Sequence, residues 1–169
     1  MKNTFTTDGD TTTVHLKNGE VALIDTADLP ILEAHKGWWG TSSNGDQAHI
    51  YSVTGTKVDG KWTSVRMHRE IMQPPPGALV DHINHNTLDN RRSNLRIATH
   101  SENLQNQGVL RKDNSTGYRG VYFVKLVQKW QAYCRVDGKR YTFGNHSTPE
   151  AANEAAIAGR QKHLPFATS

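Results

Sequence analysis

The chain holds a single cysteine, Cys134, among its 169 residues. No intramolecular disulfide can form, and the lack of any Cys-x-x-Cys pair excludes a structural zinc site of the cysteine type. No apolar run reaches the length of a membrane span, and the start Met1-Lys2-Asn3-Thr4 leads into polar residues rather than a signal peptide. We therefore expect a soluble cytoplasmic protein that binds no membrane.

Acidic residues are fewer than basic ones, at 16 against 20, so the net charge is +4 and the isoelectric point about 9.3. The charge is uneven: residues 1–60 hold four lysines against eight acids, whereas residues 61–169 hold sixteen lysines and arginines against eight acids. A basic block of this length favours a polyanionic partner such as double-stranded DNA. A solvated cationic face is the alternative.

The stretch 80–106 is too polar for a core segment and too patterned for a linker. It contains the pair Asp81-His82 and the run Asn94-Leu95-Arg96, and Thr99 with Glu102 forms a capping box that starts a short helix. Asn103 then lies in the first turns of that helix. A carboxylate and an amide oxygen suit a hard cation such as Mg²⁺, and a histidine beside them suits a general base.

Simpler interpretations exist for the same residues. Asp-His at a strand end is often a turn with a solvated histidine, and Asn-rich loops are common because Asn forms local turns. His85 and His100 are rival candidates, and His100 is close enough in sequence to share a helix face with Asn103. The combination of residues, rather than any one of them, favours a functional site.

This arrangement resembles the HNH nuclease motif, in particular that of phage and intron homing endonucleases, over roughly residues 14–110. The resemblance implies that Asp81 and Asn103 bind the metal, that His82 is the general base and that Asn94 braces the loop. An amide at position 103 favours Mg²⁺, or Mn²⁺ in its place, over zinc. Three arginines around the loop are expected to contact backbone phosphate, with a solvated state as the alternative: Arg91, Arg92 and Arg96.

Upstream of this motif, the pattern predicts a hairpin around Asn18-Gly19, with strands at 13–16 and 20–24. It further predicts a helix at 25–35, strands at 49–54 and 61–69, and loose order for residues 1–13. Trp38 and Trp39 are interpreted as core and rim residues, with stacking on a base as the alternative. His68 is left open between the active site and the core.

Residues 108–116 are interpreted as a linker. Beyond it, alternation predicts antiparallel strands at 119–124, 129–136 and 139–144, with a primed turn at Asp137-Gly138. Thr148 and Pro149 begin a helix whose alanines can lie close against one face of the sheet. The other face stays open for the major groove and includes Tyr122, Gln131, Tyr133, Arg135, Arg140 and Thr142.

Residues 117–166 resemble the plant ethylene-response-factor type of DNA-binding domain, through Tyr118-Arg119-Gly120-Val121, Phe143-Gly144 and the run from Thr148 to Ala152. The resemblance implies that Arg119, Arg135 and Arg140 contact DNA. The chain departs from the plant domains at Tyr122, Val124 and Thr142, so their target sequence cannot be carried over. Trp130 is expected in the core.

Together these features predict an α+β fold: a small HNH (ββα-metal) nuclease domain at 1–107, then a linker, then a three-stranded antiparallel sheet packed on one helix at 117–169. The expected function is a site-specific homing endonuclease, phage- or intron-encoded, which uses one divalent metal and nicks DNA as a monomer. A non-catalytic DNA-binding regulator is the main alternative, and a nonspecific or restriction-type nuclease is another.

Overall fold

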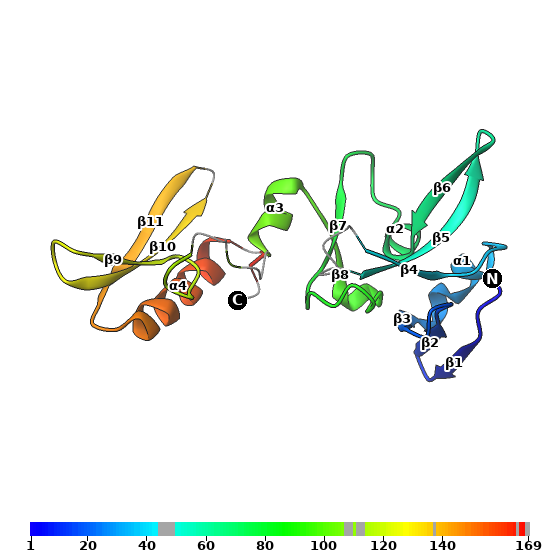
Figure 1. The fold of residues 1–169 in the computed structure, drawn as a ribbon, viewed down its shortest axis with the longest axis horizontal. Helices are drawn as coiled ribbons and strands as arrows, with labels where there is room; N and C mark the ends of the chain where they lie inside the picture. The colour runs from blue at the N-terminus through cyan, green and yellow to red at the C-terminus, as the bar shows by residue number, and fades with distance from the viewer. Residues whose placement is uncertain (44–49, 107–109, 111–113, 137, 165, 168–169) are drawn as a thin grey trace. The chain divides into compact units, whose positions relative to one another are not determined.

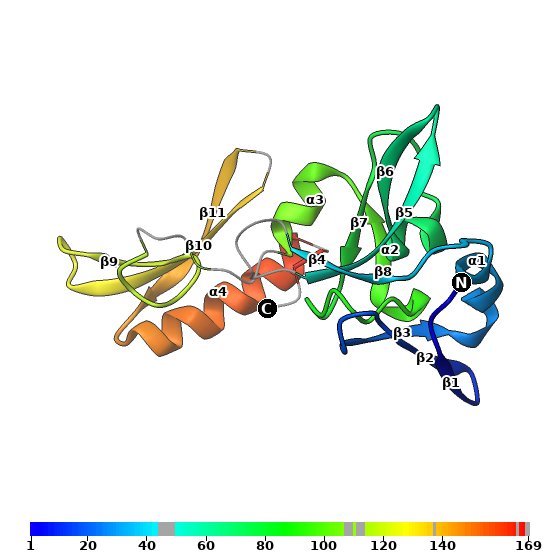
Figure 2. The same ribbon diagram turned by 45° about the vertical axis from the view of Figure 1, so that its right-hand side comes forward.

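The computed structural model describes residues 1–43, 50–106, 110, 114–136, 138–164 and 166–167. The chain forms two compact units, Met1–Thr99 and His100–Ser169 (Figures 1 and 2). Most of the expected linker, at 108–109 and 111–113, lies outside the described residues, so the domain limits of 107 and 117 remain predictions.

The first unit begins with a three-stranded antiparallel sheet in the order β1-β2-β3. The expected hairpin is present as β2 (Thr11–His15) and β3 (Val21–Asp25). The expectation of loose order at the N-terminus was wrong, because β1 (Phe5–Asp8) pairs with β2. Two short helices then cover the region expected to be helical: η1 (Thr26–Asp28) and α1 (Leu29–Glu33).

A second antiparallel sheet follows, in the order β4-β5-β6. Its strands are β4 (Gly40–Ser43), β5 (Ile50–Val58) and β6 (Lys61–Arg66). Asp59 and Gly60 both have positive φ, at 49° and 77°, as a primed hairpin turn requires. The strand expected to reach residue 69 ends at Arg66, because the next residues form α2 (Met67–Met72) and bury Met67, His68 and Ile71. His49, the expected start of β5, lies outside the described residues.

The third sheet of this unit is the pair β7 (Leu79–His82) and β8 (Leu95–Ala98), which are antiparallel. The segment between them ends in the short helix η2 (Arg92–Asn94). One hydrophobic core joins these elements to the first sheet and includes Ile24, Leu32, Trp39, Met67 and Leu95. Trp39 is fully buried, as expected, while Trp38 is exposed.

The second unit contains α3 (His100–Gln105), which begins directly after Thr99 as the capping pattern predicts. The three predicted strands are present in the order β11-β10-β9: β9 (Val121–Val124), β10 (Lys129–Val136) and β11 (Lys139–His146). Asp137, in the predicted turn, lies outside the described residues.

The last helix, α4 (Pro149–His163), packs on one face of this sheet (Figure 1). Thr148 caps it by accepting a hydrogen bond from the Ala151 N–H at 3.2 Å. Ala152 and Ala156 are buried, and a Cβ at Gly159 would overlap the Phe143 ring, so the small side of the helix allows the close approach. Trp130 packs against this cluster, as expected.

The fold is thus a mixed one, with several small antiparallel sheets and few helices. Among the described residues, no helix is both long and apolar enough to cross a membrane.

Candidate active site

The pair Asp81-His82 ends strand β7, and both side chains are buried. His82 Nε2 lies 3.2 Å from Asn90 Oδ1. Burial lowers the pKa of His82 below 6.5 and outweighs the opposite effects of the Asn90 hydrogen bond and of the Asp81 and Asp89 charges. The imidazole is therefore neutral at pH 7 and able to accept a proton.

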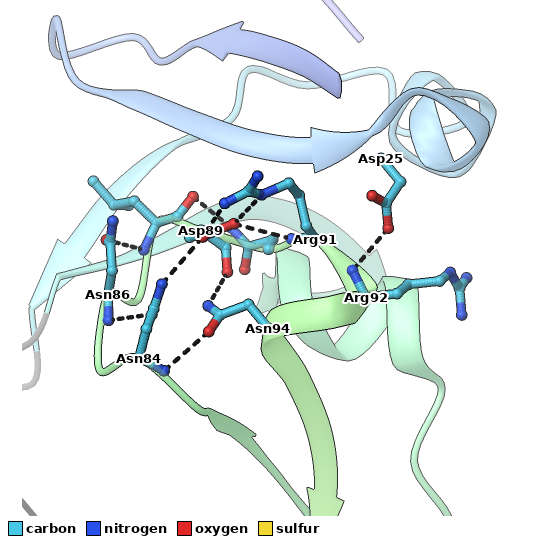
Figure 3. Close-up of polar contacts among 9 residues, drawn as sticks. Asp25, Asn84, Asn86, Asp89, Arg91, Arg92 and Asn94 are labelled. Carbon is cyan, nitrogen blue, oxygen red and sulfur yellow. Dashed lines mark hydrogen bonds and ion pairs between the residues drawn. The ribbon is translucent and has the colours of Figure 1, made fainter. Parts of the chain in front are cut away.

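The loop after β7 is held by the side chain of Asn94, which is itself buried (Figure 3). Its Nδ2 donates to the Asp89 carbonyl at 2.7 Å, and its Oδ1 accepts from the Asn84 N–H at 2.9 Å. Asn84 Nδ2 also donates to Asp89 Oδ2 at 3.1 Å. The Asn94 side chain thus ties the loop, at Asn84 and at Asp89, to the start of β8.

The same loop is docked on the first sheet by contacts that the sequence pattern did not indicate. The Leu23 N–H donates to the Leu88 carbonyl at 2.9 Å, and the Asn90 N–H donates to the Leu23 carbonyl at 2.7 Å. These bonds fix Asn90, the partner of His82, against β3. The N-terminal sheet therefore positions the loop beside the histidine.

All three loop arginines form ion pairs. Arg91 holds Asp89 through two bonds of 2.8 and 2.7 Å and lowers the pKa of that carboxyl. The Arg92 guanidinium pairs with Asp28 at 2.7 Å, and the Arg92 backbone N–H donates to Asp25 Oδ2 at 2.8 Å. Arg96 pairs with Asp81 at 2.8 Å. Their contact with phosphate stays a prediction, and each guanidinium already has a carboxylate beside it.

Two further aromatic side chains lie beside His82. The His68 ring is 3% exposed and lies edge-on to His82 with ring centroids 5.0 Å apart. The Tyr51 ring lies 5.5 Å from His68 and 6.3 Å from His82. Burial, followed by the His82 charge, lowers the pKa of His68 to about 3. The sequence left His68 open between the active site and the core, and no sequence pattern pointed to Tyr51.

The rival histidines are placed differently. His85 is exposed in the loop with a φ of 64°, and His100 is exposed at the start of α3. His82, in contrast to both, is buried, lies within hydrogen-bond distance of Asn90 and directly follows the carboxylate of Asp81.

The donors expected for a metal are oxygens, from Asp81 in the first unit and Asn103 in the second. The described residues contain no group of three or more His, Cys, Asp or Glu side chains that could hold a metal. Mg²⁺ does not require such a cage, because it keeps several waters and takes one or two protein oxygens plus substrate phosphate. The chemistry of Asp81 therefore fits Mg²⁺, although Arg96 occupies one carboxylate oxygen.

In the second unit, four of the expected DNA-binding side chains lie together on the open face of the sheet. The Arg140 guanidinium carbon lies 4.2 Å from the Tyr133 ring centroid and 4.6 Å from that of Tyr122. The Tyr122 hydroxyl donates to Gln131 Oε1. Arg135 and Thr142 are exposed on the neighbouring strand positions.

Arg119 is placed differently from that group. Its guanidinium is half-buried and donates to the carbonyls of Gln105 and Leu104 at the end of α3, at 3.0 and 3.3 Å. Burial lowers its pKa. In this structure Arg119 joins α3 to the sheet, and its contact with DNA stays a prediction.

Comparison with known proteins gives two matches. Residues 73–105 match the family described as HNH endonuclease. The chain is 30% identical over 93 residues to "Protein 3.8" of Escherichia phage T7, which covers 55% of this chain and 76% of that protein. No solved structure matches the chain. The chain therefore belongs to the same family as Protein 3.8 of phage T7, and its residues 73–105 are similar to the HNH endonuclease family.

Proposed function

We propose that the protein is a metal-dependent DNA endonuclease of the homing type. The observation that carries this proposal is the coincidence of the HNH match with the β7–β8 pair, where a buried, neutral histidine follows a carboxylate. A histidine held neutral at working pH is suited to take a proton from water. The phage relative is consistent with an enzyme that acts in the cytoplasm of a bacterial host.

In the proposed mechanism His82 removes a proton from the water that attacks the scissile phosphorus. Asn90 and the loop braced by Asn94 keep its ring in place. Asp81 and Asn103 would hold Mg²⁺, or Mn²⁺ in its place, in a ββα-metal arrangement of β7, β8 and α3. The ion would supply charge stabilisation to the leaving 3′ oxygen.

The second unit is proposed as an ethylene-response-factor-like domain that binds double-stranded DNA. Its open face carries a cation that lies over two aromatic rings, and it carries exposed polar side chains. Such a surface suits contact with base edges and phosphate. The contacts proposed are Arg119, Tyr122, Gln131, Tyr133, Arg135, Arg140 and Thr142, with Arg91, Arg92 and Arg96 near the scissile phosphate. One active site per chain suggests a monomer that nicks one strand.

Plasmid nicking by purified protein tests this function. Wild-type protein should convert supercoiled DNA to open circles with Mg²⁺ and not with EDTA. His82→Ala should lose at least a hundredfold in rate, the scale of general base catalysis, while gel-shift affinity changes little. Asp81→Ala should lose the metal response.

Other outcomes have defined meanings. Linear product in place of open circles would reject monomeric nicking. No conversion of DNA that the protein binds would reject the endonuclease and favour a non-catalytic regulator. Equal loss of cleavage and binding in His82→Ala would reject the division of labour between the two units.

A further inference from the structure

A groove of about 640 Å³ runs along the open face of the β4-β5-β6 sheet, beside α2. Its lining includes Tyr51, Val53, Ser64, Arg66 and Arg69. Val53 and Ser64 also line a second hollow, whose other residues include Trp38 and Trp62. The two hollows therefore form one continuous track on the first unit, which we call the β5–β6 track.

The register of the strands explains why aromatic and basic side chains share this face. Val53 is paired with Arg66, and Lys57 is paired with Trp62, so these alternate residues point the same way. The Arg66 guanidinium carbon lies 5.0 Å from the Tyr51 ring centroid, and Lys57 Nζ lies 5.8 Å from that of Trp62. Each end of the track thus has a cation over an aromatic ring.

The tryptophans of the track are not used by the core of this unit. Trp62 is 75% exposed and Trp38 is 47% exposed, whereas Trp39 is fully buried. Exposed rings next to cations are the surface that binds single nucleic-acid strands, since bases stack on the rings while cations contact phosphate. This chemistry favours a DNA strand over an apolar protein segment.

The charge along the track is also suitable for phosphate. Among the described residues that line the larger hollow, Glu70 carries the negative charge. Its carboxylate lies 3.0 Å from His35 Nε2. Arg66 and Arg69 supply the cations there, and Arg69 is anchored by a bond of 3.2 Å to the Ala78 carbonyl. A fixed guanidinium beside an exposed one can hold successive phosphates.

The track ends beside the candidate base. Tyr51 forms one wall of the larger hollow, and the same ring lies 6.3 Å from the His82 ring. A strand lying along the track would therefore pass next to His82.

We propose that the β5–β6 track binds the DNA strand that flanks the scissile phosphate. Arg66 and Arg69 contact its phosphates, and Trp62 stacks on a base farther along the strand. The proposal rests on the proposed endonuclease function and adds a second DNA-binding surface, on the nuclease unit itself. It makes Tyr51 and Arg66 substrate-positioning residues rather than catalytic ones.

The first test compares Arg66→Gln with Lys61→Gln in the full chain. Both remove one positive charge from β6, but Lys61 and Arg66 alternate to opposite faces of the strand. Affinity for a fluorescein-labelled 40-base-pair duplex with a single-stranded extension is measured by anisotropy over a range of salt concentrations, in EDTA. Arg66→Gln should weaken binding several-fold and reduce the salt slope by about one, while Lys61→Gln should match wild type.

DNA binding by the second unit could hide a loss of affinity at the track. Crosslinking from a single position in the track reports binding there directly. Benzoylphenylalanine is placed at position 62 or, as the control, at position 61, and each protein is irradiated with the same labelled duplex. Crosslinking from position 62 alone, reduced by Arg66→Gln, is the expected result. Equal crosslinking from both positions, or none from position 62, would overturn the track.

Plasmid nicking with Mg²⁺ separates this proposal from the proposed function. If wild type nicks DNA and position 62 does not crosslink, the track is wrong and the endonuclease stands. If position 62 crosslinks and wild type nicks no DNA under any metal condition, the surface stands and the endonuclease is wrong. Arg66→Gln should raise the DNA concentration needed for half-maximal nicking more than it lowers the maximal rate.

Discussion

Arg96 stands directly opposite Asp81 across the β7–β8 pair, and its Nε donates to Asp81 Oδ2 at 2.8 Å. Both side chains are largely shielded from solvent, at 19% and 10% exposed. The proposed metal ligand is thus compensated by a cation within the protein itself. A metal ion at Asp81 must share the carboxylate with Arg96 or displace it.

Arg96→Gln should therefore destabilise the protein and make it more responsive to metal. Removing one partner of a shielded ion pair costs about 3 kcal/mol, because the remaining charge stays buried. A divalent cation can compensate that charge, so Mg²⁺ should raise the melting temperature of Arg96→Gln more than that of wild type. Calorimetry with and without Mg²⁺ measures both effects.

Two variants control for this result. Arg91→Gln removes the same charge from a pair with Asp89 and should show no added response to Mg²⁺. Asp81→Asn combined with Arg96→Gln should also show none, since the ligand is gone. An equal Mg²⁺ response in all four proteins would mean that Asp81 does not bind the ion.

Asn94→Asp tests the brace of the loop. The substitution keeps an acceptor for the Asn84 N–H but replaces the donor to the Asp89 carbonyl with a negatively charged oxygen. A buried acceptor left without its donor costs about 2 kcal/mol. Chemical denaturation should show this loss, and nicking should fall because the loop also carries Asn90, which contacts His82.

Asn86→Ala is the matched control for that variant. Asn86 lies in the same loop but is exposed, and its side chain accepts a single bond, from the Leu88 N–H at 3.1 Å. Its removal should change stability by less than about 0.5 kcal/mol. Equal effects of the two substitutions would show that Asn94 has no special role in holding the loop.

Much of this architecture follows from local patterns. Asn18-Gly19 predicted the β2–β3 hairpin, alternation predicted β9, β10 and β11, and Thr148-Pro149 predicted the start of α4. These signals depend on neighbours in sequence, where turn chemistry and periodicity act directly.

The surroundings of His82 depend on contacts between residues far apart in sequence. Arg92 pairs with Asp28 across 64 residues, and Tyr51 reaches His82 from another sheet. Nothing in local periodicity records such pairs. At Met67 the alternating pattern was misleading, because Met67 and Ile71 are four residues apart and are buried on one side of a helix.

His68 should make the protein less stable in acid. Its pKa of about 3 in the folded state lies below the unfolded value of 6.5, so the unfolded chain binds more protons between these values. Stability from this residue is therefore complete above pH 6.5 and falls as the pH decreases toward 3. The expected loss between pH 7 and pH 5 is about 2 kcal/mol.

Urea denaturation of His68→Phe at the two pH values measures that loss. Phenylalanine fills the site beside Tyr51 and His82 but cannot be protonated, so stability should depend less on pH than in wild type. His15→Gln, at an exposed histidine, should keep the wild-type pH dependence. If His68→Phe keeps it too, His68 is not the source of the acid sensitivity.

Arg140→Lys tests whether the open face of the second unit uses geometry or charge alone. The Arg140 guanidinium lies over both the Tyr122 and the Tyr133 ring, and lysine cannot keep a planar group there. If Arg140 presents its donors to a base or phosphate in this fixed position, Arg140→Lys should weaken duplex binding about tenfold, near the value of a single good contact.

Lys139→Gln, on the opposite face of β11, loses a charge but should bind as wild type does. Gel-shift titrations of the full chain compare the three proteins. Wild-type affinity in Arg140→Lys, together with a loss in Lys139→Gln, would mean that total charge and not this face determines binding.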